Sequence, residues 1–211
     1  MCKNHINYST ITRCVNENSG NTLYLDNGKI RCQSVNISKN KGSNRLIRFY
    51  PSINSNTAIS YSTVSDNNAN RFTCFILWNY GEFEFKNCNI LRNTQNDLSS
   101  EGTFFALGNV MIKDSCILGN NANYIFHQRY SSNTFTISNC TVDRTTNNGC
   151  LTIQSTATKS FILTLNHMST RNCYAEYSMN GMRAPLKQSS KQLFSTLLEH
   201  INTLSLKFLF H

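Results

Sequence analysis

No unbroken run of eighteen apolar residues occurs in the 211-residue sequence, so a transmembrane helix is not expected. The first residues, Met1-Cys-Lys-Asn-His5, lack the apolar core of a secretory signal peptide, and we expect none. The repeat described below begins by Ile6, which leaves no room for an N-terminal cap. One interpretation is that the sequence is a fragment of a longer gene product.

Charge is also scarce, and acidic residues are scarcer than basic ones. Charged residues make up 15% and hydrophobic residues 39% of the sequence, both below the averages of about 25% and 45–50% for globular domains. Twenty Lys and Arg against eleven Asp and Glu leave a net charge of +9, which invites an acidic partner. The basic residues are scattered without a run of five or six. We therefore expect a weakly positive surface and no specific nucleic-acid ligand.

Cysteine is present, but it lacks the spacing of a metal site or a redox motif. The nine cysteines are an odd number and include no C-x-x-C pair and no Cys/His cluster. Cys88 and Cys140 hold the same position of the repeat but lie two copies apart, which is about 10 Å in stacked strands and beyond disulfide reach. We predict buried thiols, no metal site and no cofactor.

A short pattern recurs seven times: an apolar residue, a small residue three positions later, usually a β-branched residue two later, and often Asn three later. The third members lie at 11, 37, 64, 90, 117, 142 and 170, so the period is 25 to 28 residues. A fixed period in the range of about 20–50 residues indicates a solenoid, a propeller or an array. The copies are Ile6/Ser9/Ile11/Cys14, Cys32/Val35/Ile37/Asn40, Ile59/Ser62/Val64/Asn67, Phe85/Cys88/Ile90/Asn93, Ile112/Ser115/Ile117/Asn120, Ile137/Cys140/Val142/Thr145 and Leu165/Met168/Thr170/Cys173.

The spacing inside each copy predicts short strands with one buried face. Steps of two residues are those of a strand, and the single step of three indicates a bend that keeps the apolar set facing inward. Turn residues separate each copy from a second apolar strand, and stacking equal periods pairs each strand with its own copy above and below. The sequence predicts an all-β, right-handed parallel β-helix of about six to seven coils. The second strands are expected at 23–25, 46–49, 75–77, 104–107, 124–126 and 151–153.

Asparagine closes four consecutive copies at the same predicted corner. Aligned amides at such a corner can hydrogen-bond along the stack and satisfy turn groups that would otherwise be buried without partners. We predict a structural ladder of Asn40, Asn67, Asn93 and Asn120.

The repeat does not continue to the end of the chain. We expect a β-helix domain over residues 4–177 and a non-repeat tail over 178–211. Apolar residues at helical spacing from Leu193 to Phe208 predict an amphipathic helix that caps the last coil. A helix on a membrane surface and a tail from a wrong reading frame are the alternatives.

The repeat resembles that of the polymorphic membrane protein family, in which a G-G-A-[ILV] segment precedes an F-x-x-N segment by about twenty residues. The second segment appears here as Ile37-Ser-Lys-Asn40, Val64-Ser-Asp-Asn67, Ile90-Leu-Arg-Asn93 and Ile117-Leu-Gly-Asn120, and the first survives as Gly20-Asn-Thr-Leu. The resemblance implies a right-handed, pectin-lyase-like β-helix displayed on a cell surface. It also implies adhesion to a host or cell-surface glycan or protein.

Parallel β-helices also carry polysaccharide lyases and hydrolases, which need clustered carboxylates on one outward face. The eleven acidic residues are dispersed. Glu82 and Glu84 share an outward face, but their expected neighbours in the next coil, Asn109 and Met111, are not acidic. No Ser/His/Asp arrangement or phosphate-binding glycine loop is evident. We identify no catalytic residue.

The position before the corner Asn is basic in four of seven copies and predicts an outward cationic ladder of Arg13, Lys39, Arg92 and Arg144. Asp66 and Gly119 interrupt it, and an ordinary solvated face is the alternative. An anionic glycan is the ligand that such a ladder would bind.

Three N-glycosylation sequons are present, at Asn7, Asn36 and Asn139. Asn36 and Asn139 are expected to face solvent because they alternate with inward residues.

We therefore expect a non-enzymatic surface or interaction module with an adhesin-like role. The alternatives are a degenerate polysaccharide-active β-helix and a truncated gene product without an independent function.

Overall fold

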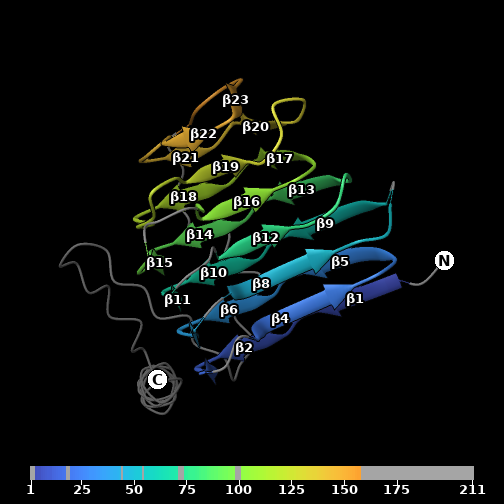
Figure 1. Cartoon of the computed structure of the whole chain (residues 1–211), viewed down its shortest axis with the longest axis vertical. Helices are drawn as coiled ribbons and strands as arrows, with labels where there is room; N and C mark the ends of the chain where they lie inside the picture. Colours follow the sequence, from blue (N-terminus) through green and yellow to red (C-terminus); the bar gives the residue numbers. More distant parts are fainter. Residues whose placement is uncertain are drawn as a thin grey trace, which may run out of the picture. The chain divides into compact units, whose positions relative to one another are not determined.

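The computed structural model describes residues 3–17, 20–43, 45–53, 55–70, 74–97 and 101–157. These residues form the expected right-handed parallel β-helix, and no helix occurs among them. Figure 1 shows the strands stacked coil upon coil from the blue N-terminal end to the orange end near residue 157. Within the described ranges, no helix could span a membrane. The predicted C-terminal helix and the copy at 165–173 lie outside these residues.

Four parallel sheets, here named A to D, form the walls of the helix. Sheet A contains β1 (Lys3–Asn7), β5 (Lys29–Gln33), β9 (Asn56–Ser60), β13 (Glu82–Lys86), β17 (Asn109–Lys113), β20 (Thr134–Ser138) and β23 (Cys150–Ile153). Sheet B contains β2 (Thr10–Thr12), β6 (Asn36–Ser38), β10 (Thr63–Ser65), β14 (Asn89–Leu91), β18 (Cys116–Leu118) and β21 (Thr141–Val142). Sheet C contains β3 (Val15–Asn16), β7 (Lys41–Gly42), β11 (Asn68–Ala69) and β15 (Thr94–Gln95). Sheet D contains β4 (Asn21–Asp26), β8 (Arg45–Tyr50), β12 (Phe75–Leu77), β16 (Phe104–Ala106), β19 (Phe126–Gln128) and β22 (Asn147–Asn148).

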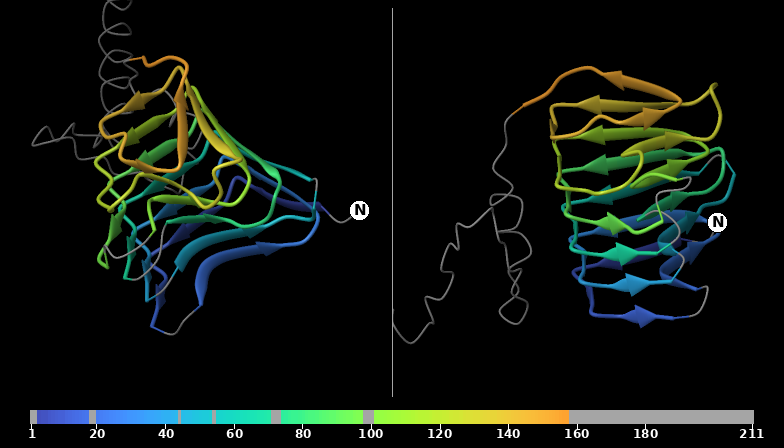
Figure 2. Two further views of the ribbon diagram at one scale, coloured as in Figure 1. Left: turned by 45° about the horizontal axis from the view of Figure 1, so that its top comes forward. Right: turned by 60° about the vertical axis from the view of Figure 1, so that its left-hand side comes forward.

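The repeat predicts the register of the stack correctly. In sheet B, Val64 pairs with Ile37 on one side and with Ile90 on the other, and Ile90 pairs with Ile117. The apolar first members of the repeat pair in the same order in sheet A, where Phe85 lies between Ile59 and Ile112. Figure 2 shows the resulting vertical alignment of the strands in two further views.

The described residues complete about five turns, fewer than the expected six to seven. Successive strands of sheet A start at residues 3, 29, 56, 82, 109, 134 and 150, so five circuits take 25 to 27 residues and the sixth takes 16. Each of the first four turns holds four strands, whereas two or three were expected in each period. The additional strand is the two-residue strand of sheet C, which follows the Asn corner.

Residues 151–153 form a strand, as expected, but this strand lies in sheet A and not with the other second strands in sheet D. Leu151 pairs with Phe135 in sheet A, and the short strand β22 takes the place in sheet D beside β19. Gly149, with φ of +95°, turns the chain directly from β22 into β23. A Cβ at this position would lie 2.6 Å from the Gln128 Cβ, so only glycine permits this short circuit.

The expected bends are single residues in the left-handed conformation. In each copy of the repeat, one left-handed residue lies between the strand of sheet A and the strand of sheet B. In most copies a second left-handed residue lies directly after the strand of sheet B. The first bend holds Tyr8, Ser34, Tyr61, Asn87, Asp114 and Asn139, and the second holds Arg13, Lys39, Asp66, Arg92 and Gly119, with φ between 49° and 65°. One left-handed residue turns the chain sharply without adding length, which keeps the inward side chains in register.

Aromatic rings fill the centre of the helix. Phe75, Phe104 and Phe126 stack face to face in successive coils, with ring centroids 5.0 and 5.8 Å apart. Phe85 meets Phe75 and Phe104 edge-on at 5.2 and 5.3 Å. These rings are fully buried, and such offset and edge-to-face pairs add to the hydrophobic stabilisation of the core.

The small residue of the repeat has a structural role that the sequence analysis did not identify. The Ser62 hydroxyl accepts a hydrogen bond from Val35 N and donates to Ser60 O in its own coil. Ser115 does the same between Cys88 N and Lys113 O. Cys88 uses its thiol as a weaker donor to Ile59 O and Lys86 O. The position therefore requires a small side chain that fits inside the bend.

The rate at which each cysteine thiol is alkylated tests whether that thiol is buried, as predicted from the sequence and found in the structure. Burial raises the pKa of Cys32, Cys74 and Cys88 to about 12, whereas Cys14 and Cys150 are exposed. Because the thiolate is the nucleophile, native protein treated briefly with iodoacetamide at pH 8 should be alkylated at Cys14 and Cys150 and spared at the three buried thiols. Peptide mass spectrometry measures this, with urea-unfolded protein as the control. Rapid native alkylation of Cys88 would contradict the described core.

Candidate functional site

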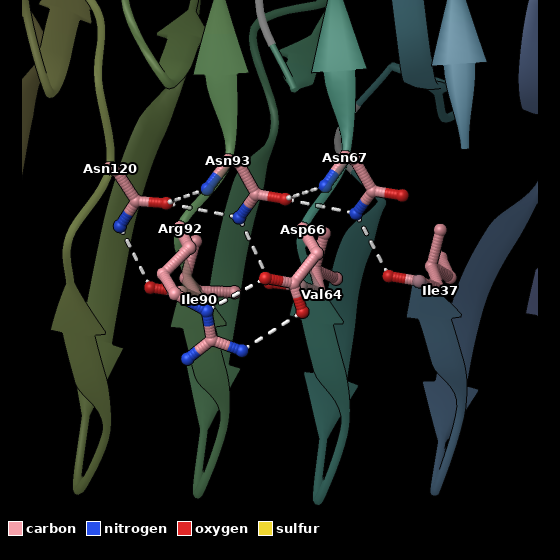
Figure 3. Close-up of polar contacts among 8 residues, drawn as sticks. All are labelled: Ile37, Val64, Asp66, Asn67, Ile90, Arg92, Asn93 and Asn120. Atoms are coloured by element: carbon pink, nitrogen blue, oxygen red, sulfur yellow. Dashed lines mark hydrogen bonds and ion pairs between the residues drawn. The ribbon is translucent and has the colours of Figure 1, made fainter. Parts of the chain in front are cut away.

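The corner asparagines form a continuous ladder along the stack (Figure 3). The side-chain oxygen of Asn93 accepts hydrogen bonds from the backbone N–H and the side-chain amide of Asn67, at 3.2 and 2.9 Å. The Asn93 amide donates to Val64 O at 2.9 Å and to the side-chain oxygen of Asn120 at 3.0 Å. Asn40 bonds to Asn67 in the same way.

These amides are inside the protein and are not available to a ligand. The four asparagines are 0–2% exposed. Each side chain offers an oxygen acceptor and two N–H donors. The ladder uses both donors of Asn40, Asn67 and Asn93, and one donor of Asn120, on the neighbouring coils. The cluster is therefore a structural device that closes the corner between sheets B and C.

The basic residues before the corner do not form a continuous cationic ladder. Arg92 makes two parallel bonds to the Asp66 carboxylate, Nε to Oδ1 at 2.7 Å and an N–H of the second nitrogen to Oδ2 at 2.9 Å (Figure 3). Arg144 is directed to the backbone carbonyls of Asn120 and Ala122, at 3.4 and 3.5 Å. Arg13 and Lys39 are exposed at the other end of this row. The residue that interrupts the predicted ladder thus neutralises one of its members.

The three sequons differ in accessibility. Asn7 and Asn139 are exposed, and Asn139 donates to the Asp114 carboxylate. Asn36, in contrast, is 8% exposed, so the expectation that it faces solvent was wrong. It lies in sheet B between Thr10 and Thr63, and its burial shows that alternation along a strand does not by itself imply exposure.

The acidic residues do not come together in an arrangement for glycoside chemistry. Glu82 and Glu84 pair with Asn109 and Met111, as expected, and Glu84 lies 3.5 Å from the Lys113 amine. Burial raises the pKa of Glu101, while Arg45 and Arg129 act in the opposite direction. Within the described ranges, no group of three or more His, Cys, Asp and Glu side chains could hold a metal ion.

The outer face of sheet D instead gathers aromatic and cationic side chains. The inward residues of this sheet, such as Phe49, Phe75 and Phe104, belong to the central core. Alternation then directs the intervening residues outward, and the register aligns them in two rows. The first row is Tyr24, Arg48, Ile76, Phe105 and His127. The second row begins with the paired Asp26 and Tyr50, and Trp78, Leu107 and Arg129 follow directly after β12, β16 and β19.

Three aromatic rings surround the Arg48 guanidinium. Its central carbon lies 5.2 Å from the ring centre of Tyr24, 5.8 Å from that of Tyr50 and 5.4 Å from that of Trp78. Tyr24 is 45% exposed, and Arg48, Tyr50 and Trp78 are half-buried. This group, here called the Arg48 cluster, is held by cation–π attraction.

An apolar group continues the same face from the Arg48 cluster along the stack. Ile76, Phe105 and Leu107 form a hydrophobic cluster separate from the central core, and Trp78 packs against it. The Trp78 and Phe105 ring centres are 6.3 Å apart, and Phe105 meets His127 edge-on at 5.0 Å. Ile76, Phe105 and Leu107 are only 1–7% exposed. The outer side of sheet D therefore changes from a partly exposed aromatic and cationic group at β4 and β8 to a buried apolar cluster at β12 and β16.

Sequence reasoning did not identify this face as a candidate site, although a signal was present. The second strands were read for their inward residues alone, and Arg48 was included in the segment Leu46–Phe49 without a role. Aromatic residues at outward positions of two or more coils are the signal that could have found it. No family model, curated protein or solved structure matches the chain.

Removing one rung of the asparagine ladder should destabilise the helix strongly. Asn93→Leu leaves Asn67 N and Val64 O buried without partners, and each unsatisfied group costs about 1–3 kcal/mol. We expect a loss of about 3 kcal/mol in the free energy of unfolding, measured by urea titration and circular dichroism. Asn96→Leu is the matched control, because Asn96 is exposed and bonds to other asparagines at the surface. Equal stability of the two variants would contradict a structural ladder.

Proposed function

We propose that this chain is a non-enzymatic binding module that presents the partly exposed Arg48 cluster of sheet D to a surface glycan. The observation that carries the proposal is the set of aromatic rings placed outside the core at the Arg48 cluster. Tyr24, Tyr50 and Trp78 are partly exposed, although the core does not need them there. Exposed aromatic and arginine side chains are characteristic of binding surfaces.

Glycans suit this face because of its shape and chemistry. A strand-built wall is flat, and an aromatic ring offers a negative face to the C–H bonds of a sugar. Stacked coils repeat about every 4.8 Å, so side chains in one row meet a polymer at regular intervals. The resemblance of the repeat to the polymorphic membrane protein family supports an extracellular, adhesin-like role.

A binding role fits the described residues better than catalysis does. Glycoside hydrolases use two carboxyl groups at a defined separation, and lyases need a base beside a charge that stabilises the intermediate. Glu101 has a raised pKa but is influenced by two arginines and by no second carboxyl group. Glu101 therefore offers the polysaccharide-active alternative no carboxyl pair within the described ranges.

A glycan array with the full chain tests the proposal. We expect retention of a subset of glycans, with binding reduced about tenfold by Tyr24→Ala, because loss of an anchor residue typically costs more than about 1 kcal/mol. Met111→Ala is the matched control, since it removes an exposed apolar side chain from sheet A. Bound glycans should also stay intact on prolonged incubation. Failure to retain any glycan, or release of shortened products, would overturn the proposal.

A further inference from the structure

We infer that Arg48 is an anion-binding residue and that the ligand of this face is an acidic saccharide. The inference rests on the proposed function and deepens it. It assigns the recognition of a carboxylate or sulfate group to one side chain, in a different place from the predicted basic ladder.

The Arg48 guanidinium has ring contacts but no hydrogen bond or ion pair among the described residues. Its Nε is buried and has no hydrogen-bond partner. A buried donor without a partner costs about 1–3 kcal/mol, and more when it is charged. Most buried polar groups in native proteins have a hydrogen-bond partner. A guanidinium with a buried donor that lacks one therefore indicates that a bound ligand supplies an acceptor to the group.

The surrounding rings leave a defined direction for that partner. The guanidinium carbon lies over three ring faces, at 5.2 to 5.8 Å from their centres, and the five N–H donors of the group lie in its own plane. Asp26 lies two residues after Tyr24 on the same strand, and burial and the Asp26 carboxylate raise the pKa of Tyr24. This carboxylate makes no ion pair with Arg48 among the described residues. An oxyanion that approaches in the plane can accept two hydrogen bonds from the terminal nitrogens of Arg48, whereas the buried Nε is not accessible to it.

The rings on either side indicate that the anion is part of a sugar. Tyr24 lies one coil before Arg48 and Trp78 one coil after it. Along the row of Arg48 the neighbours are Tyr24 on one side and the buried Ile76 on the other. A ligand at the guanidinium can therefore contact the Tyr24 ring in the same row and the Trp78 ring beside it. A simple inorganic anion would use the guanidinium alone and would leave the exposed face of Tyr24 without a contact. The protein's net charge of +9 favours an acidic ligand over a neutral one.

Titration calorimetry of the full chain distinguishes these ligands. The probes are an oligogalacturonate for carboxylate groups, a heparin-derived oligosaccharide for sulfate groups, a neutral cello-oligosaccharide, and polyglutamate as an acidic polymer without sugar rings. We expect one or both acidic saccharides to bind at least about tenfold more tightly than the neutral one and polyglutamate. Arg48→Gln should remove most of this preference, because a charge-assisted bidentate contact is worth a factor of about ten or more.

Two further variants test whether Arg48→Gln weakens binding through the lost ligand contact, through the lower net charge or through impaired folding. Arg31→Gln removes the same charge from the exposed face of sheet A and should bind like the unaltered protein. Arg48→Lys keeps the charge but loses the bidentate geometry, so binding should weaken while thermal unfolding stays close to that of the unaltered chain.

The outcomes distinguish this inference from the proposed function. Equal loss of binding in Arg31→Gln and Arg48→Gln would overturn the inference and indicate general charge attraction. Tight binding of polyglutamate would overturn it as well, since rings would then not be recognised. Binding of the neutral oligosaccharide that is insensitive to Arg48→Gln would overturn the inference while leaving a glycan-binding module. Binding of no saccharide at all would overturn both.

Discussion

The register between successive coils is the constraint on which the rest of this structure depends. Each strand bonds to its own copy in the coils on either side, so the backbone of one turn is satisfied by the next. The corner asparagines extend this rule to the turns, where sheet hydrogen bonds cannot be made. Because Asn67, Asn93 and Asn120 bond both to the neighbouring backbone and to each other, a shift of one residue would break every rung at once.

The same register controls the surface as well as the core. In sheet D, Phe75 and Phe104 stack inside while Ile76 and Phe105 align outside on the same strands. Outward residues can therefore vary without disturbing the stacked rings, and a face for a ligand can be built one coil at a time. The Arg48 cluster uses this freedom, since its three rings come from adjacent coils that the core already holds in place.

Several features could be read from the sequence because they follow from local periodicity. Ile37, Val64 and Ile90 recur at a fixed spacing, and equal spacing requires equal positions in the stack. The inward-facing Asn ladder followed for the same reason.

Other features could not be predicted from local periodicity. Asn36 alternates with inward residues yet is buried, since burial depends on what lies across the strand. The segment 151–153 resembles its predecessors but joins sheet A, because Gly149 shortens the last circuit and no local pattern counts the missing residues.

The sequence by itself determined the fold class, the period and the side chains that face the core, because backbone hydrogen bonding forces identical repeats into identical positions. Only the tertiary structure decided which outward residues meet. Arg92 and Asp66 are 26 residues apart in the chain and form an ion pair, whereas Arg48 lies among three rings and has no anionic partner in the described residues. Both arginines look alike in the sequence, because charge and spacing do not reveal what the adjacent coil places beside them.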